Sequence, residues 1–218
     1  MKKYVIGIDE VGRGALAGPV VVAVVLIPKN LKPSARGGSS LGGKTFNLKP
    51  TLRDSKKLSP SQREKWFKFF KNHPQIKYTL AKVFPRSIEK INISRAANLA
   101  ALRAYLRLIK SFKFQVPSSR VYLDGGLFLG NGQKRIPAKT VVKGDEKIQA
   151  IQIASIIAKV SRDKLMTRLA KKYPKYGFEI HKGYGTRAHL AAIKKYGASE
   201  IHRLTFISKY FSIKKSSI

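Results

Sequence analysis

The stretch that decides the fold is YVIGIDEVGRGALAGPVVVAVVLI, residues 4–27. Both of its ends are rich in Val and Ile, which predicts two buried strands over 4–11 and 20–27. The connection between them contains three glycines, as a tight turn with close backbone approach requires. Two adjacent carboxylates, Asp9 and Glu10, lie inside this hydrophobic stretch. Burying a carboxylate is costly unless it is paired, so the pair needs a chemical reason.

The composition predicts a folded, strongly basic protein. The chain has 218 residues, of which 43% are hydrophobic, and it carries 45 Lys and Arg against 11 Asp and Glu, a formal charge of +34. This length suits one domain, or one domain with a small appendage. Such a charge attracts polyanions, with nucleic acid the first candidate and an anionic membrane surface the second. A general adaptation for solubility stays open, because net charge informs about association rather than fold.

Several classes of site and location are excluded by simple features. The chain has no cysteine, which rules out disulfides, thiolate nucleophiles and cysteine-based zinc sites. Its four histidines form no HExxH pair. No apolar run is long enough to span a bilayer, and the N-terminal MKKYVIGIDE meets its acidic pair too early for a signal peptide. We therefore expect a soluble, cytoplasmic monomer that does not associate with membranes.

The remaining elements are predicted from periodicity and from helix-start signals. Ser59, Pro60 and Gln62 form the pattern of a capping box with proline in the first turn. Early strands that follow one another favour antiparallel pairing, whereas later strands separated by helices favour parallel pairing by crossovers. The sequence therefore predicts an α/β fold with a mixed sheet. The expected elements are a surface loop over 29–51, a helix from 60, a strand over 76–84, a helix over 92–111, strands over 120–124 and 137–143, a helix over 147–172 and a last helix ending before Gly197. The apolar stripe expected on the 147–172 helix includes Ile148, Ile151, Ser155, Ala158, Leu165 and Leu169.

Three acids share one position, at or near the end of an apolar strand with glycine close by. They are Asp9 in GIDEVG, Asp124 in VYLDGG and Asp145 in VVKGDE. Strand ends are where ligands bind in open α/β sheets, so we expect these carboxylates to converge. A divalent cation would remove their mutual repulsion, and donors that are all oxygen favour Mg²⁺ or Mn²⁺. Two ions about 4 Å apart can clamp a phosphodiester. Taken alone, Asp9 could equally be paired with a Lys or Arg.

The chain also resembles a known family, ribonuclease HII (type 2 ribonuclease H). The resemblance extends from about residue 5 to 206. It rests on seven motifs in order: GIDEVGRGALAGPVVVAVV, DSKKLS, INISRA, YLDGG, VVKGDEKIQAIQIASIIAKVSRD, HKGYGT and HRLTF.

This resemblance implies a fold, a division of the chain and an activity. It implies a ribonuclease H-like catalytic domain over 1–172, with a mixed five-stranded sheet flanked by helices. A helical C-terminal part over 173–218 would complete the substrate site. The implied enzyme is an endoribonuclease that hydrolyses the RNA strand of RNA/DNA hybrids. It would also incise 5′ of single ribonucleotides in duplex DNA by two-metal-ion hydrolysis, leaving 3′-hydroxyl and 5′-phosphate ends.

The resemblance also assigns residues. The family's catalytic, metal-binding carboxylates match Asp9, Glu10, Asp124 and Asp145, and these would hold Mg²⁺ or Mn²⁺. The residues implied to bind substrate at the RNA–DNA junction are Gly12, Arg13, Gly14 and Tyr184. The two lysines of DSKKLS are Lys56 and Lys57. They could hold phosphates of the substrate, or they could belong to a solvated loop. Without the motif, Tyr184 would be an ordinary packed aromatic.

Alternatives remain open at this point. Asp163 lies 18 residues beyond Asp145, about 27 Å away along one continuous helix, so we expect it to be structural. A non-catalytic basic nucleic-acid-binding protein would explain the charge but not the acids. The related ribonuclease HIII usually carries an extra N-terminal domain and lacks the glycine-arginine-glycine. The C-terminal KYFSIKKSSI could be a docking tail, so a sliding-clamp partner stays open, but nothing in this stretch indicates one.

Overall fold

The computed structural model is built on one five-stranded sheet with the strand order β5-β2-β1-β6-β7. It describes residues 3–31, 40–41, 44–45, 58–112, 119–130 and 135–211. The strands of the sheet are β1 (Tyr4–Val11), β2 (Val20–Pro28), β5 (Lys77–Val83), β6 (Ser119–Asp124) and β7 (Lys139–Val141). Two short strands from the predicted 29–51 loop pair separately, β3 (Ser40–Leu41) and β4 (Lys44–Thr45).

The sheet is mixed, as the sequence predicted. Strand β1 pairs antiparallel with β2, and β2 pairs antiparallel with β5. On its other side β1 pairs parallel with β6, and β6 pairs parallel with β7. The strand that carries Asp9 and Glu10 is therefore central, and the ends of β1, β6 and β7 lie at the same edge of the sheet.

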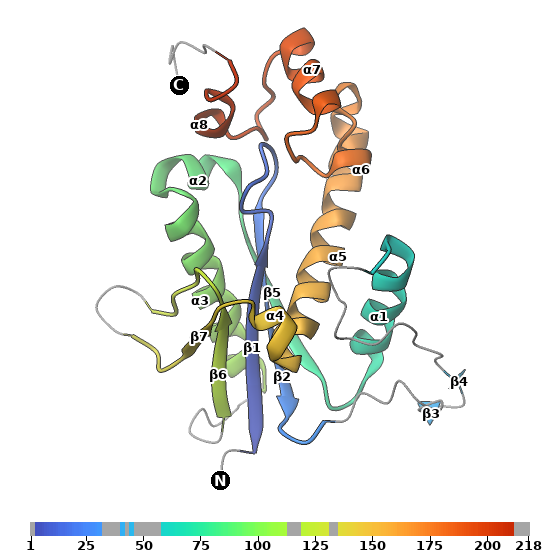
Figure 1. Ribbon diagram of the computed structural model, residues 1–218, viewed down its shortest axis with the longest axis vertical. Helices are drawn as coiled ribbons and strands as arrows, with labels where there is room; N and C mark the ends of the chain where they lie inside the picture. Colours follow the sequence, from blue (N-terminus) through green and yellow to red (C-terminus); the bar gives the residue numbers. More distant parts are fainter. Residues whose placement is uncertain are drawn as a thin grey trace.

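Helices cover both faces of the sheet (Figure 1). Helix α3 lies against one face, whereas α1 and α5 lie against the other. Helix α1 begins with the predicted capping box at Ser59 and Gln62, and the short helix α2 was not predicted. The helices are α1 (Pro60–Asn72), α2 (Pro85–Ile91), α3 (Ile93–Phe112), α4 (Gly144–Lys147), α5 (Gln149–Lys172), a 3₁₀ turn (Pro174–Tyr176), α6 (Phe178–His181), α7 (Arg187–Tyr196) and α8 (Leu204–Ile207).

The Val-rich strand β2 is buried on both faces, which explains its continuous apolar sequence. Val22 and Val24 belong to the core beneath α3. Ala23 and Val25, which point the other way, belong to the core beneath α1 and α5. Two-sided burial of this strand fixes the sheet between its helices.

Helix α5 touches the backbone of β1 at Gly7. A Cβ atom built on Gly7 would lie 2.2 Å from the carbonyl carbon of Ala150, in the first turn of α5. No side chain fits at such a distance. The glycine therefore allows a direct backbone contact between β1 and α5, two residues before Asp9.

The turn between β1 and β2 is inserted into the C-terminal helical part (Figure 1). The N–H groups of Leu16 and Ala17 donate to Gly183 O, at 2.8 and 3.2 Å. Gly18 N donates to Ile201 O at 2.8 Å, and Leu16 O accepts from Arg203 N at 2.7 Å. The first and last parts of the described chain therefore meet at this turn.

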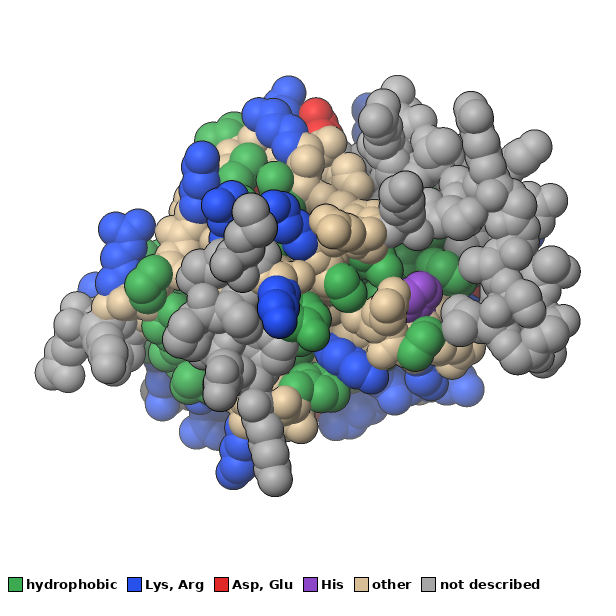
Figure 2. Space-filling model, turned by 90° about the horizontal axis from the view of Figure 1, so that it is seen from below, with side chains coloured by type: hydrophobic (Ala, Val, Ile, Leu, Met, Phe, Trp, Pro, Cys, Tyr) green, Lys and Arg blue, Asp and Glu red, His purple; other side chains and the backbone are tan. Residues whose placement is uncertain are grey.

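The surface is basic away from this turn as well. Figure 2 shows the opposite end of the molecule, where Lys and Arg side chains predominate over acidic ones. None of the described helices combines the length and the apolarity that a membrane span requires.

Candidate active site

The parallel pairing of β1 and β6 brings two of the predicted carboxylates to neighbouring strand ends. Ile8 lies opposite Leu123, so Asp9 and Asp124 are the next residue along each strand. Asp9 is only 5% exposed, and Glu10 is partly buried beside it.

These carboxylates influence one another electrostatically. Burial raises the pKa of Asp9 well above its usual value, and the negative charges of Glu10 and Asp124 raise it further. Hydrogen bonds from the Ser155 side chain and the Glu10 N–H act in the opposite direction. Burial also raises the pKa of Glu10, against the lowering effect of Arg13. The three acids thus form one cluster of mutually repelling groups.

Asp145 lies in the turn that follows β7, beside the end of β6. Gly144 N donates to Asp124 Oδ1 at 2.8 Å, which fixes the residue just before Asp145 against the end of β6. Lys143 turns the chain there with a left-handed φ of 54°. Asp145 itself is 2% exposed. All four predicted carboxylates therefore lie at one edge of the sheet.

The donor chemistry of the cluster fits a divalent cation. Its donors are carboxylate oxygens, the ligands that Mg²⁺ and Mn²⁺ prefer. Glu10 Oε2 is buried and has no hydrogen-bond partner within the described part of the chain. Over the same residues, no group of three or more acids or histidines is close enough to hold a metal ion as it stands. Binding a cation would therefore have to draw these side chains closer together.

Arg13 faces the acid cluster. Its Nη1 lies 3.3 Å from Glu10 Oε1 and donates to Gly126 O at 3.1 Å. Its Nη2 donates to Ser94 Oγ at 2.9 Å. The guanidinium thus offsets one carboxylate and connects the turn after β1 to the start of α3.

The two glycines that flank Arg13 have different roles. Gly12 is buried with φ 86°, and a Cβ there would lie 2.2 Å from Arg162 Nε. Gly14 is exposed, and no atom lies within 4 Å of where its Cβ would be. Gly12 therefore makes room for Arg162, while Gly14 leaves the backbone of the turn open to a ligand.

Two fully buried arginines hold this turn, Arg162 and Arg203, and neither was predicted as a site residue from the sequence. Arg203 donates to the carbonyl oxygens of Gly12, Arg13 and Gly18 at 2.7 to 3.1 Å. Arg162 donates to those of Ala17 and Pro19, both at 3.0 Å, and to that of Lys182 at 2.8 Å. Burial lowers the pKa of both guanidinium groups. A signal existed, because both arginines lie within quoted motifs and Arg162 lies seven residues after Ser155, on the same face of α5.

Tyr184 lies at the same end of the molecule and is half-buried. Arg162 Cζ lies 5.2 Å and Lys159 Nζ 5.7 Å from the centre of its ring. Its neighbour Gly183 accepts the hydrogen bonds from the β1–β2 turn. Tyr184 is thus not a core aromatic, and Arg162 connects it to Gly12.

Comparison with known proteins agrees with this arrangement. A family model described as Ribonuclease HII matches residues 6–209. The chain belongs to the ribonuclease HII family. A Ribonuclease HII from Endomicrobium trichonymphae is 43% identical over 207 residues, covering 93% of this chain and 84% of that protein. The ribonuclease H2 from Pyrococcus horikoshii OT3 has a TM-score of 0.67 at 25% identity, covering 93% of both chains. Bst-RNase HIII in complex with Mn²⁺ has the same fold, with a TM-score of 0.67 at 17% identity, covering 96% of this chain and 68% of that chain.

Membership makes the protein a metal-dependent endoribonuclease that acts on RNA/DNA hybrids. It also excludes the non-catalytic alternative and decides between ribonucleases HII and HIII. The five-stranded mixed sheet and its flanking helices confirm the predicted ribonuclease H-like fold.

Three of the four histidines, His181, His189 and His202, are structural. His189 Nδ1 donates to Tyr184 O at 2.9 Å, so its Nε2 must accept the proton of His202 Nε2, 3.1 Å away. His202 Nδ1 then accepts from Ser199 N at 2.9 Å. His181 stacks on His189 with ring centres 4.3 Å apart. All three rings are thus satisfied in the neutral form, and burial lowers the pKa of His189 and of His202 to about 4.

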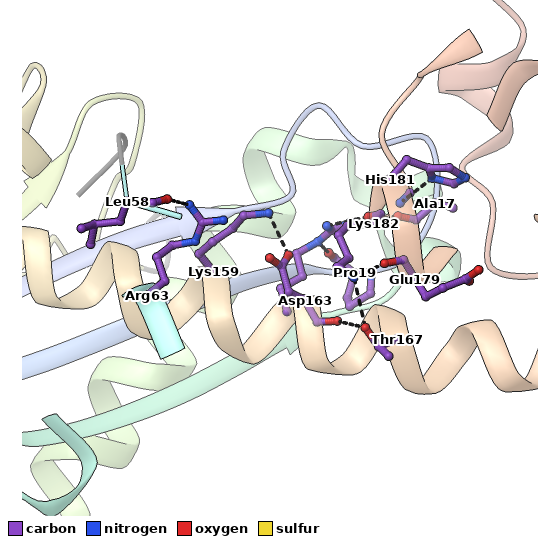
Figure 3. A network of polar contacts seen from close by, with 12 residues as sticks. Ala17, Pro19, Leu58, Arg63, Lys159, Asp163, Thr167, Glu179, His181 and Lys182 are labelled. Carbon is purple, nitrogen blue, oxygen red and sulfur yellow. Dashed lines mark hydrogen bonds and ion pairs between the residues drawn. The ribbon is translucent and has the colours of Figure 1, made fainter. Parts of the chain in front are cut away.

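Two further predictions concern the flanks of the site. Asp163 pairs with Lys159 at 2.8 Å (Figure 3), as expected for a structural acid. The helix assumed to join Asp163 to Asp145 is not continuous, because Ile148 is extended between α4 and α5. Lys56 and Lys57 lie outside the described residues.

Proposed function

We propose that this enzyme hydrolyses RNA in RNA/DNA hybrids and also incises duplex DNA 5′ of single ribonucleotides, leaving 3′-hydroxyl and 5′-phosphate ends. Asp9, Glu10, Asp124 and Asp145 would hold two Mg²⁺ or Mn²⁺ ions. The observation that carries the proposal is the gathering of these buried and half-buried acids at one sheet edge in a strongly basic protein. The Mn²⁺ complex of the similarly folded Bst-RNase HIII supports a divalent ion in this fold.

The ions would stabilise the charge that develops on the scissile phosphate during hydrolysis. The chain itself supplies positioning. The hydrogen bonds of Ser155 and of the Glu10 N–H orient Asp9, and that of Gly144 orients Asp124. Cation binding would reverse the repulsion that raises the pKa of Asp9.

Recognition of the ribonucleotide is assigned to the turn and to Tyr184. The exposed backbone at Gly14 can approach a 2′-hydroxyl, which only RNA offers. Arg13, already close to the acids, can bind a phosphate in bidentate fashion if it exchanges its present partners. Tyr184 can stack on the sugar of the adjoining deoxynucleotide. In this scheme the part over 173–218 completes the substrate site of the catalytic domain over 1–172.

The test uses a DNA duplex with one ribonucleotide and either Mg²⁺ or Mn²⁺. Wild-type enzyme should cut 5′ of the ribonucleotide, and Asp124→Asn should lower the rate at least about a thousandfold, since a metal ligand is lost. Glu200→Gln is the matched control, because within the described residues this exposed acid pairs with Lys172 and Tyr173 on the surface and with no active-site group. An intact duplex with wild-type enzyme, or full activity in Asp124→Asn, would refute the assignment.

A second variant tests the junction residue. Tyr184→Ala should reduce incision at a single ribonucleotide about tenfold or more, within the range of base or sugar stacking on an aromatic ring. Cleavage of a continuous hybrid should be less affected. Tyr184→Phe keeps the ring and should behave as wild type. Equal losses on both substrates, together with a lower melting temperature, would mean that the tyrosine is structural.

A further inference from the structure

A groove separate from the acid cluster follows the outer side of α5. Its volume is about 1000 Å³, and it lies between the start of α1, strand β5, helix α5 and helix α6. We call it the α5 groove and define it by Arg63, Lys82, Lys159, Lys164, Arg168 and Lys182. Figure 3 views part of this region along α5.

The α5 groove is positively charged. Beside its six basic side chains the lining has three acidic ones, which leaves a surplus of three positive charges. Two cations are neutralised locally, Lys159 by Asp163 and Lys164 by Glu64, both at 2.8 Å. Lys82 and Arg168 form no ion pair within the described part of the chain and are available to an anionic ligand.

The walls between these cations are partly apolar. Leu80 and Val160 contribute to the lining, and the side chain of Ile180 is 79% exposed at one side. Alternating cations and apolar surface suit a sugar–phosphate backbone, whose charged phosphates alternate with less polar sugars.

Helix α5 runs without a break from the proposed active site into the α5 groove, which gives the two regions continuity along one element. Ser155 bonds to Asp9, and Lys159, one turn further along α5, both lines the groove and lies over the Tyr184 ring. From Ser155 to Arg168 the helix rises about 20 Å. That length corresponds to about six base pairs of duplex DNA.

From this continuity we infer that the α5 groove binds the phosphate backbone of DNA on one side of the ribonucleotide, up to about six base pairs from the cut. The inference rests on the proposed function. It adds a second contact region, in which Lys82 and Arg168 bind phosphates remote from the reacting bond. Affinity should therefore depend on the length of one flank of the substrate.

The test compares a double variant, which carries both Lys82→Met and Arg168→Met, with the parent protein. Both proteins carry Asp124→Asn, so that binding is measured by fluorescence anisotropy without cleavage. The probes are hairpin-capped duplexes with one ribonucleotide, in which either flank is about four or about twelve base pairs long. The control is Arg103→Met with Lys110→Met, which removes two exposed cations from α3 on the opposite face of the sheet.

Loss of two phosphate contacts should weaken binding about tenfold when one particular flank is long. It should also reduce the magnitude of the slope of log binding constant against log salt concentration by about 1.8. Binding of the duplex with that flank short should be unchanged, as should the control. Unchanged affinity for every duplex would overturn the inference. It would do so even if a poly-glutamate peptide bound the groove, because the ligand would then be an acidic peptide and not DNA. An equal loss for short and long flanks would overturn it too. Neither result affects the proposed function, which fails if wild-type enzyme does not incise or if Asp124→Asn keeps full activity.

Discussion

The buried guanidinium of Arg203 offers the sharpest test of how the active-site turn is held. Arg203→Met keeps most of the side-chain volume and removes every donor. The carbonyl oxygens of Gly12, Arg13 and Gly18 then lose their hydrogen bonds from Arg203 in a place that water reaches poorly, since Arg203 is 0% exposed.

Each buried acceptor left without a donor costs about 1 to 3 kcal/mol. Among the described residues, Arg13 O and Gly18 O are left without a donor, whereas Gly12 O keeps a long bond from Ala15 N at 3.5 Å. The two orphaned acceptors would cost about 2 to 6 kcal/mol, and the variant no longer has to bury a charge. We therefore expect the free energy of unfolding to fall by about 3 to 5 kcal/mol. For a chain of this size that lowers the melting temperature by about 6 to 20 °C.

Urea denaturation at neutral pH measures the loss, and cleavage of a duplex with one ribonucleotide measures its effect on the turn. Activity should fall even at temperatures where the variant stays folded, because the backbone around Arg13 is no longer fixed. Arg187→Met, on the exposed start of α7, is the control and should change stability by less than about 0.5 kcal/mol. A loss below about 1 kcal/mol in Arg203→Met would refute the reasoning.

Three further outcomes are expected. Mg²⁺ at about 100 times its dissociation constant should stabilise the wild type by about 2.7 kcal/mol and should leave an Asp9→Asn, Asp124→Asn double variant unchanged in urea denaturation; equal stabilisation of both would place the ions elsewhere. The pKa of His189 and of His202 is about 4 in the folded chain and about 6.5 when unfolded, so the unfolded state binds more protons between these values. The free energy of unfolding should then fall as pH drops through this window, by up to about 1.4 kcal/mol per pH unit for each histidine, and His202→Asn should flatten that slope. Gly7→Ala should destabilise the protein by about 3 kcal/mol or more, as overpacking against backbone does; a melting temperature like that of the wild type would contradict the close contact with α5.

Most of the fold was predictable because its signals are local. The run of Val and Ile in β2 and the capping box at Ser59 each depend on neighbouring residues, and the structure has both where the sequence predicted them. The stripe on α5 was predicted correctly at Ile151 and Ala158. Further along, Leu169 is partly buried against the C-terminal core as predicted, but the more deeply buried residues there are Met166 and Ala170, which the predicted stripe did not include.

The candidate site was predictable to the extent that strand ends reveal it. Asp9 and Asp124 were found because each ends an apolar strand, and the parallel pairing makes them neighbours. Arg162 and Arg203 were missed because they bind backbone carbonyl groups that are distant in the sequence. Arg162 binds those of Pro19 and Ala17, more than 140 positions away, and Arg203 binds those of Gly12 and Gly18, more than 180 positions away. The motifs mark the positions of both arginines, but no local pattern indicates which distant carbonyl groups they bind.

The contact between Gly7 and the first turn of α5 has a consequence for how the acids are spaced. Side chains in a core can adopt other rotamers when their neighbours change. Two backbones in direct contact have no side chain between them that could adjust in this way. The backbone contact therefore fixes the distance between the strand of Asp9 and the helix of Ser155, independently of how the side chains of the surrounding core pack. Substitutions that loosen the cores on either side of the sheet should lower stability well before they widen the gap in which the ions are proposed to bind.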